Sequence, residues 1–337
     1  MNKTVRQGIP HELLDRESLR ERMNDLAGGG MPFLFIIDYE ARQGYVIEED
    51  KIDPEFIRFQ IGMEGTAASA LEIQEKLLQW EVTPVSKEEY QQRFTYVVSQ
   101  IRSGNSFLTN LTQPSLLTTN YSLLELYQRS SAKYKLWLKD TFLVLSPETF
   151  VTIRKGEIVS CPMKGTIDAT LEQAEEQILN DQKELAEHAT IVDLIRNDLS
   201  MVAGNVRVTR FRFVERIRTM QTDLLQVSSE IKGDLPADYQ KRIGDILFSL
   251  LPAGSICGAP KEKTLDIIRQ AEGYDRGFYT GVCGYFDGLD MESAVMIRYI
   301  EQQGDHLVFK SGGGVTSQSQ CDSEYNELIQ KIYVPVS

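Results

Sequence analysis

The sequence predicts a mixed α+β domain in which antiparallel sheets are sandwiched by helices. Apolar runs of strand length follow one another across turns, which is typical of antiparallel sheets. Long segments of helical spacing stand apart from these runs instead of alternating with every strand. Because no shift in composition marks a linker, we expect a single domain over residues 1–337, with 1–85 as an N-terminal part packed on a core at 86–335.

The N-terminal part is predicted to contain one polar helix and two strands. Residues 1–30 have helical character and end at three consecutive glycines. The apolar run at 32–38 is typical of a buried strand, and a second strand follows at 44–47 after a turn.

The core begins with a helix and then changes repeatedly between strands and helices. Ser86 is a suitable N-cap for a helix over 86–103, and Glu89 stands three residues later, as in a capping box. Further helices are expected at 171–198, 238–250, 260–271 and 319–332. Strands are expected near 107–112, 142–145, 149–154, 157–160, 205–211, 225–231, 277–285, 293–301 and 306–311.

The composition excludes several classes of function. The 337 residues are 42% hydrophobic, enough for a large core, and the net charge of -13 opposes nonspecific binding to nucleic acid or to an anionic membrane. The N-terminus lacks the apolar segment of a signal peptide, and no apolar run approaches the length of a membrane span. The four cysteines form no CxxC pair, so we predict free thiols in a cytoplasmic protein.

Lys164 lies in the sequence Cys-Pro-Met-Lys-Gly-Thr, where a strand-like run meets a Gly-Thr turn. Two interpretations follow: a solvated lysine at a turn, or an amine placed to do chemistry. Lysines are usually exposed, so the motif by itself favours the first interpretation.

Two pairs of glutamates stand three residues apart, Glu184 with Glu187 and Glu324 with Glu327. On a helix this spacing places both carboxylates of a pair on one face, where they repel unless a cation lies between them. Two facing pairs would suit Mg²⁺, which prefers oxygen ligands. The alternative is two solvated acidic faces with ordinary pairs such as Glu327 with Lys331.

Two glycine-rich segments are candidate anion sites. Residues 251–273 run from a glycine-rich turn into a helix, with Pro260 suited to its first turn and Gly273 placed to end it. Backbone N–H groups at such a junction attract carboxylate or phosphate. The glycines at 312–314 follow a strand and would let a ligand approach the backbone closely. Either segment is equally compatible with a simple turn.

Taken together and in order, these segments resemble the chorismate-using enzymes, of which anthranilate synthase component I represents the expected fold. The matching motifs span most of 86–335: SPETF (146–150), PMKGT (162–166), KELAEHATIVDLIRNDLS (183–200), GSICGAPKEKTLDII (254–268), RGFYTGVCGYF (276–286), AVMIR (294–298) and SGGGVTSQSQCDSEYNELIQK (311–331). Within the family the chain is most similar to aminodeoxychorismate synthase component I, which has lysine before Gly-Thr where anthranilate synthases have alanine. The N-terminal part is shorter than in full-length relatives.

The resemblance implies roles for the candidate residues. Lys164 would be the nucleophile, neutral when it attacks, and Glu148 the acid that protonates the departing hydroxyl, with a raised pKa. The resemblance also implies Mg²⁺ ligands and substrate contacts: Glu184, Glu187, Glu324 and Glu327 for the metal, and Tyr279, Arg298, Gly313 and Lys331 for chorismate. The alternatives are a core tyrosine for Tyr279, a structural ion pair for Arg298 and the helical pair with Glu327 for Lys331.

Two positions depart from patterns known among relatives. Leu108 stands where water-adding relatives carry a lysine base, which argues against an isochorismate or salicylate synthase. Gln226 stands where many relatives have a histidine, so no proton transfer is assigned there.

The resemblance also implies partners. None of the cysteines lies in a Gly-x-Cys-x-Gly setting, so we expect ammonia from solution or from a separate glutaminase subunit. The reaction implied is conversion of chorismate and ammonia to 4-amino-4-deoxychorismate, a step of folate and 4-aminobenzoate biosynthesis. Two alternatives stay open: an anthranilate synthase component I and a noncatalytic chorismate-binding subunit.

Overall fold

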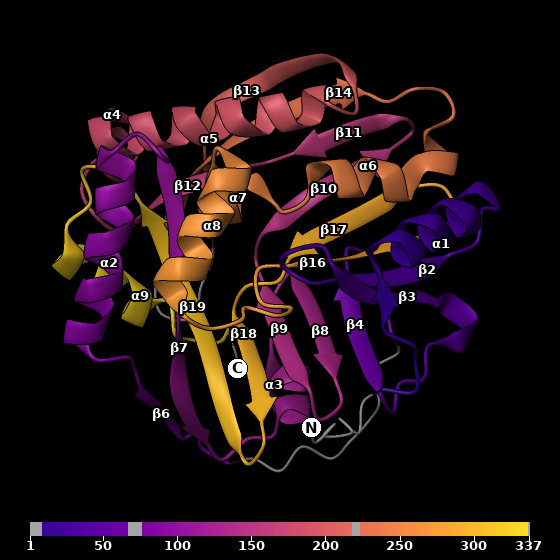
Figure 1. The fold of residues 1–337 in the computed structure, drawn as a ribbon, viewed down its shortest axis with the longest axis horizontal. Coiled ribbons are helices and arrows are strands. Elements are labelled where there is room, and N and C mark those ends of the chain that lie inside the picture. The colour runs from indigo at the N-terminus through magenta and orange to yellow at the C-terminus, as the bar shows by residue number, and fades with distance from the viewer. Residues whose placement is uncertain (1–8, 67–75, 218–222, 336–337) are drawn as a thin grey trace.

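Two antiparallel sheets lie face to face, and helices cover their outer faces (Figure 1). The computed structural model describes residues 9–66, 76–217 and 223–335. Within these ranges every strand pairing is antiparallel. The predicted fold class, a mixed α+β domain with sheets sandwiched by helices, is therefore confirmed.

The first sheet combines strands from the two ends and the middle of the chain. Its strands follow the order β1 (Leu14–Asp15), β3 (Gln43–Glu48), β2 (Phe33–Ile37), β16 (Val282–Phe286), β17 (Met291–Val295), β10 (Thr149–Arg154), β11 (Glu157–Ser160), β14 (Leu224–Asp234) and β12 (Met163–Asp168), with β13 (Gly204–Ile217) also paired to β14.

The second sheet has its own set of strands. They follow the order β15 (Gly258–Ala259), β7 (Leu108–Thr119), β19 (His306–Val315), β18 (Tyr299–Gln303), β9 (Phe142–Ser146), β8 (Tyr134–Leu138), β4 (Ile57–Ile61) and β5 (Glu64–Gly65). In addition, β6 (Trp80–Thr83) pairs with the C-terminal residues of β7.

Nine α-helices lie in the described residues, with short 3₁₀ turns at Glu49–Lys51 and Tyr239–Arg242. They are α1 (Arg16–Gly28), α2 (Lys87–Arg102), α3 (Leu123–Arg129), α4 (Ala174–Asn180), α5 (Gln182–Ser200), α6 (Ile243–Leu250), α7 (Gly254–Cys257), α8 (Lys261–Glu272) and α9 (Cys321–Gln330).

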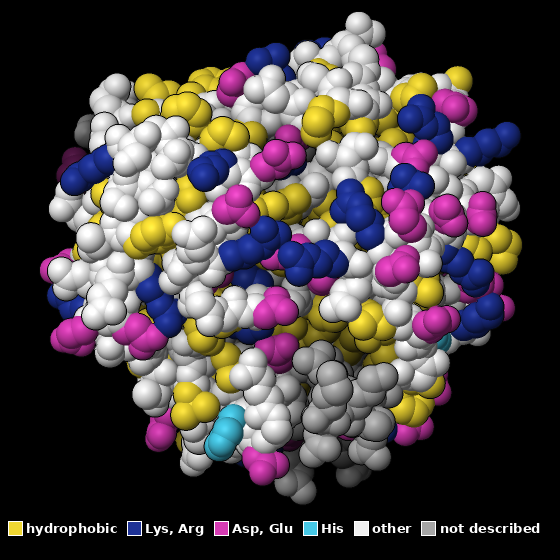
Figure 2. All heavy atoms as spheres, viewed as in Figure 1, with side chains coloured by type: hydrophobic (Ala, Val, Ile, Leu, Met, Phe, Trp, Pro, Cys, Tyr) yellow, Lys and Arg dark blue, Asp and Glu magenta, His cyan; other side chains and the backbone are white. Residues whose placement is uncertain are grey.

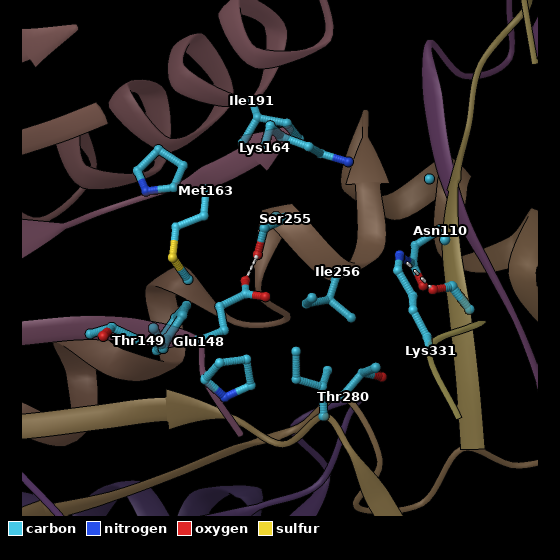
Figure 3. Close-up of a pocket in the computed structure, with 18 of the residues that line it drawn as sticks. Asn110, Glu148, Thr149, Met163, Lys164, Ile191, Ser255, Ile256, Thr280 and Lys331 are labelled. Atoms are coloured by element: carbon cyan, nitrogen blue, oxygen red, sulfur yellow. Dashed lines mark hydrogen bonds between the residues drawn. The ribbon is translucent and has the colours of Figure 1, made fainter. Parts of the chain in front are cut away.

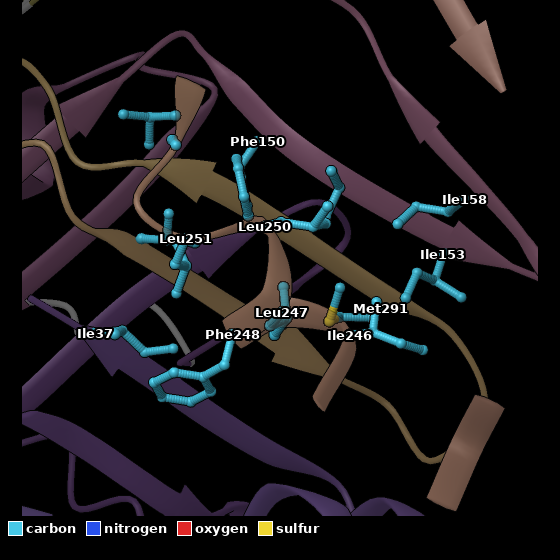
Figure 4. Close-up of a cluster of buried hydrophobic side chains, with 14 of the residues drawn as sticks. Ile37, Phe150, Ile153, Ile158, Ile246, Leu247, Phe248, Leu250, Leu251 and Met291 are labelled. Atoms are coloured by element: carbon cyan, nitrogen blue, oxygen red, sulfur yellow. The ribbon is translucent and has the colours of Figure 1, made fainter. Parts of the chain in front are cut away.

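The alternation of side chains along β2 shows how the layers are held together. Successive residues of a strand point to opposite faces of its sheet. Phe33, Phe35 and Ile37 therefore pack outward against α1, α5 and α6, while Leu34 and Ile36 pack inward between the two sheets. Figure 4 shows the outward cluster, where α6 contributes Ile246, Leu247 and other apolar side chains. A third cluster joins the second sheet to α2, α3, α8 and α9.

Several helix ends follow the sequence prediction. The Ser86 hydroxyl accepts a hydrogen bond from the Glu89 backbone at 3.2 Å and caps α2. Gly273 ends α8 with φ of 66°, a left-handed conformation that glycine adopts without steric cost. The helix predicted over 1–30 begins at Arg16, and residues 1–8 lie outside the described residues.

Two predicted elements were wrong because each is divided in the structure. The helix expected over 171–198 is interrupted at Asp181, whose side chain accepts from the Glu184 backbone at 3.0 Å and caps α5. The strand expected over 293–301 is divided into β17 and β18, which belong to different sheets. The break ends at Arg298, whose φ of 51° is incompatible with an extended strand. Elements β1, β4, β5, β6, β8, β12, β15, α3 and α7 were not predicted, and the strand expected over 277–285 begins at Val282.

The N-terminal part contributes strands to both sheets, β2 and β3 to the first and β4 to the second. The division at residue 85 stays a prediction. All four cysteines are free thiols, as expected. No described helix is long and apolar enough to cross a membrane. On the face shown in Figure 2, acidic and basic side chains are interspersed.

Candidate active site

A cavity of about 520 Å³ brings together all ten residues that the sequence marks as candidates. Its wall contains segments of both sheets and of α5, α7 and α9. Figure 3 shows part of this wall, with Glu148, Lys164 and Lys331. The candidates on this wall are Glu148, Lys164, Glu184, Glu187, Tyr279, Arg298, Gly313, Glu324, Glu327 and Lys331. Their positions are thus compatible with one site, while the role of each stays a prediction.

A bulge in β12 places Lys164. Met163 pairs with Ser228 and Thr166 pairs with Gln226, so three steps along β12 face two steps along β14. Gly165 takes up the extra residue with φ of 79°. Such bulges redirect side chains, and Lys164 points into the cavity in Figure 3. Its Nζ lies 3.5 Å from the position that a Cβ on Gly314 would occupy.

Glu148 lies in the turn between β9 and β10, opposite the short helix α7. Its Oε1 accepts a hydrogen bond from the Ser255 hydroxyl at 3.1 Å, and its backbone carbonyl accepts from Val295 N–H at 3.1 Å. Burial raises the pKa of the Glu148 carboxyl, although the Ser255 bond and the charges of Lys164, Lys331 and Arg298 act in the opposite direction. The raised pKa expected from the sequence is confirmed.

The first glutamate pair lies on one face of α5. Glu184 and Glu187 line the cavity together with Ile191 and Ile195, which follow at helical spacing on the same face. Glu184 Oε2 lies 3.1 Å from the position that a Cβ on Gly165 would occupy, next to Lys164. The Asp181 cap fixes where this helix starts, and with it the position of the pair.

The second pair lies on α9, against the glycine run of β19. A Cβ on Gly313 would meet Glu327 Oε1 at 3.2 Å and Glu324 Oε2 at 3.7 Å. Lys331 Nζ donates to Glu327 Oε1 at 2.5 Å and to the Gly312 carbonyl at 3.2 Å. The helical pair considered as an alternative for Lys331 is thus formed, and Lys331 lines the cavity as well.

Tyr279 and Arg298 lie where the two sheets meet. Tyr279 is buried against Tyr299, with ring centroids 5.7 Å apart, and burial raises the pKa of its phenol, which stays an O–H donor. Arg298 Nη2 donates to the Tyr333 hydroxyl at 3.3 Å. Its Nε is buried without a hydrogen-bond partner among the described residues. Tyr279 therefore belongs both to the core and to the cavity wall.

The wall carries both signs of charge in close proximity. Four basic side chains line it, Lys164, Arg298, Lys310 and Lys331, against six acidic ones, Glu148, Glu184, Glu187, Asp198, Glu324 and Glu327. In the described ranges no group of three or more His, Cys, Asp or Glu side chains is arranged to hold a metal ion. Mg²⁺ usually takes only one or two protein carboxylates and keeps several waters. The assignment of the two glutamate pairs to this ion therefore stays a prediction.

The structure adds wall residues that sequence reasoning did not mark. Ser255 bonds to Glu148, and Asn110, Thr280 and Lys310 also line the cavity. The Gly-Ser step inside the glycine-rich segment was a signal for Ser255. Of the glycine-rich segment at 251–273, α7 lines the cavity through Gly254, Ser255 and Ile256, whereas α8 does not. An anion site on this segment stays a prediction.

Leu108 packs against the same glycine as Lys164. Its Cδ1 lies 3.1 Å from the position of a Cβ on Gly314, whereas Lys164 Nζ lies 3.5 Å from that position. An apolar side chain with 5% exposure therefore lies beside the Lys164 amine. The Leu108 side chain has no group that can deprotonate a water molecule.

Comparisons with known proteins agree on one family. The model for chorismate binding enzymes matches residues 34–337. An uncharacterized PabA-like protein of Pasteurella multocida is 48% identical over 94% of this chain and 98% of its own length. Aminodeoxychorismate synthase component 1 of Klebsiella aerogenes is 30% identical over 91% of this chain and 69% of its own. The structure of anthranilate synthase component I from Streptococcus pneumoniae has a TM-score of 0.64, at 25% identity over 75% of this chain and 58% of that one.

Proposed function

Because the chain belongs to the chorismate-binding enzyme family, we propose that it is an aminodeoxychorismate synthase component I. It would convert chorismate and ammonia to 4-amino-4-deoxychorismate and water through an intermediate bound to a lysine. The observation that carries the proposal is the pair formed by Lys164 and Glu148: a primary amine and a carboxyl of raised pKa on the wall of one cavity.

The two side chains divide the work of the first half-reaction. The Lys164 amine forms a bond to C2 of chorismate, both ring double bonds shift, and the bond between C4 and its hydroxyl breaks. Glu148 supplies the proton with which the hydroxyl leaves as water. Its raised pKa keeps the carboxyl protonated at higher pH than an exposed glutamate.

Ammonia completes the reaction. It forms a bond to C4, both ring double bonds return, and the bond between C2 and Nζ breaks, which regenerates Lys164. The proton that the new ammonium group at C4 loses restores the Glu148 acid. Leu108 supports this assignment, because no basic side chain at that position competes by activating water. We propose that a separate glutaminase subunit supplies the ammonia, as the sequence resemblance implies.

Enzymes of this family generally use Mg²⁺. We propose that Glu184, Glu187, Glu324 and Glu327 hold it, either directly or through water. A bound Mg²⁺ would supply positive charge to a substrate carboxylate in a cavity rich in acidic groups. Tyr279, Arg298, Lys331 and the backbone N–H groups around Gly313 would then orient the substrate by hydrogen bonding to its carboxylates and ring.

Gly313→Ala should weaken chorismate binding in the presence of Mg²⁺ by about tenfold, on the scale of groups that orient metal ligands. The added methyl would lie 3.2 Å from Glu327 Oε1, closer than carbon and oxygen ordinarily approach, so the carboxylate must move. Calorimetric titration with chorismate measures the change. Gly204→Ala is the matched control, since the nearest atom to its methyl is 3.9 Å away and outside the cavity wall. Equal affinities in the two variants would contradict the placement of the α9 pair.

The proposed reaction is tested with purified protein, chorismate, Mg²⁺ and ammonium, followed by mass spectrometry of the products. We expect 4-amino-4-deoxychorismate and no pyruvate. Anthranilate with an equal amount of pyruvate would instead establish an anthranilate synthase. Unchanged chorismate, in a sample that binds chorismate by calorimetry, would establish a noncatalytic binding subunit.

A further inference from the structure

An ion pair behind the cavity wall has no place in the proposed chemistry. Arg276 and Glu272 side chains are each 1% exposed, and neither lines the cavity. Arg276 Nη2 donates to Glu272 Oε1 at 2.6 Å and Arg276 Nε to Glu272 Oε2 at 2.8 Å, a two-pronged contact. A buried ion pair is weak evidence for stability, because removing both charges from water offsets much of their attraction.

The remaining donors of Arg276 reach three separate segments of the wall. Nη2 donates to the Asn110 carbonyl of β7 at 2.7 Å, and Nη1 donates to the Ile256 carbonyl of α7 at 3.3 Å and to the Thr280 hydroxyl at 3.2 Å. All five N–H groups of the guanidinium are thus used. Asn110, Ile256 and Thr280 all line the cavity, and Figure 3 shows them there.

Other contacts fix the ion pair in turn. Glu272 Oε1 also accepts from Thr112 N–H at 2.7 Å and from the Thr112 hydroxyl at 2.9 Å. The Arg276 carbonyl accepts from Lys310 Nζ at 3.0 Å, and the Tyr39 ring lies 4.3 Å from its guanidinium. These contacts fix the position of the Arg276 side chain, which in turn holds the three wall segments relative to one another.

Thr280, which accepts a hydrogen bond from Arg276, has an unusual backbone conformation. Its φ of 62° lies in the left-handed region, which is strained for a β-branched residue and recurs at functional sites. Its N–H donates to the Met296 carbonyl at 2.8 Å, and Met296 N–H donates to the Gly281 carbonyl at 2.8 Å. These bonds tie the turn that carries Tyr279 to the segment that carries Arg298, which is itself left-handed with φ of 51°.

We infer that the Arg276–Glu272 pair is a positioning device that holds Thr280 in its left-handed conformation and so sets where Tyr279 and Arg298 meet the substrate. The inference rests on the proposed function in that both side chains contact chorismate. Through the Ile256 carbonyl the same guanidinium also holds α7, whose Ser255 bonds to Glu148. Arg276 is thus a positioning residue and touches no reacting atom.

The test is calorimetric titration with chorismate and Mg²⁺, with every variant in a Lys164→Ala background so that no covalent step occurs. Arg276→Lys keeps the charge but loses the forked donor set, and we expect chorismate binding to weaken about 10- to 100-fold, as when orienting partners of a site are removed. Leu117→Ala is the matched control, because Leu117 is buried in the core at 3% exposure and lies outside the cavity wall. It should lower the melting temperature without changing the chorismate Kd.

A second substitution separates positioning from stability. Glycine adopts positive φ freely, so Thr280→Gly combined with Arg276→Lys should weaken binding less than the product of the two single effects. The inference would be overturned if the effects of the two substitutions on the chorismate Kd multiply. It would also be overturned if Arg276→Lys lowers the melting temperature and leaves the Kd unchanged. If Arg276→Lys fails to fold, Glu272→Gln in the same titration gives the same decision. A wild-type chain that binds chorismate but makes no 4-amino-4-deoxychorismate would end the proposed function and leave this test intact.

Discussion

Lys164→Ala should lower the rate of 4-amino-4-deoxychorismate formation by about three orders of magnitude or more, the scale of loss when a covalent nucleophile is removed. In the absence of ammonia the wild-type chain should gain the mass of chorismate less one water, and the variant should gain nothing. The physical reason is that Lys164 supplies the electron pair that displaces the C4 hydroxyl, which leaves as water with the proton from Glu148. Intact-protein mass spectrometry after incubation with chorismate and Mg²⁺ measures the adduct.

The matched control for this experiment is Lys263→Ala, which removes an exposed lysine of α8 outside the cavity. It should form the adduct and turn over like the wild type. A Lys164→Ala chain that still accumulates the adduct would show that another amine reacts. A wild-type chain without adduct, but with normal product formation, would favour direct attack by ammonia and leave Lys164 as a substrate-binding cation.

The sequence was sufficient to predict that the fold is built of sheets and helices, but not to predict where one strand ends and the chain crosses to the other sheet. The run at 32–38 predicted a buried strand because apolar residues occupy both of its faces, and β2 packs in that way on both sides. Nothing local marks the break between β17 and β18. The residues there are apolar up to Arg298, and only the crossing from one sheet to the other requires its positive φ. Tertiary structure thus overrides a local pattern that was correct for each half.

The parts of the candidate site that depend on the spacing of residues along a helix could be predicted from the sequence. Three-residue spacing already placed each glutamate pair on one helical face, and both pairs line the cavity. Arg276 lies within one of the family motifs, but the sequence assigns it no role, because its side chain contacts Asn110 and Ile256, which are distant in sequence. The direction of Lys164 depends on a bulge whose existence is fixed by pairing with β14. The contacts of Arg276 and the direction of the Lys164 side chain could therefore not be predicted from the sequence.

Glu148→Gln should lower the rate of product formation by about 10²- to 10⁴-fold, the usual contribution of a general acid. The amide keeps the shape of the side chain and its contact with Ser255 but has no acidic proton for the departing hydroxyl. Chorismate affinity should change little, because the proton is needed during bond breaking and not for binding. A variant that loses affinity and retains its maximal rate would make Glu148 a binding residue.

The pH dependence gives the same residue a second, independent test. Because burial raises the pKa of Glu148, the wild-type rate should fall as pH rises through that raised value, and Glu148→Gln should lack this decline. The Ser255 bond lowers the pKa of the carboxyl against the effect of burial, so Ser255→Ala should move the decline to higher pH. Stability follows the same sign, since the native state holds this proton more tightly than the unfolded chain and loses that advantage as pH rises through the raised pKa. Raising the pH from mildly acidic to neutral should therefore lower the melting temperature of the wild type more than that of Glu148→Gln. A decline in rate at the same pH in the wild type, Glu148→Gln and Ser255→Ala would assign the ionisation to another group.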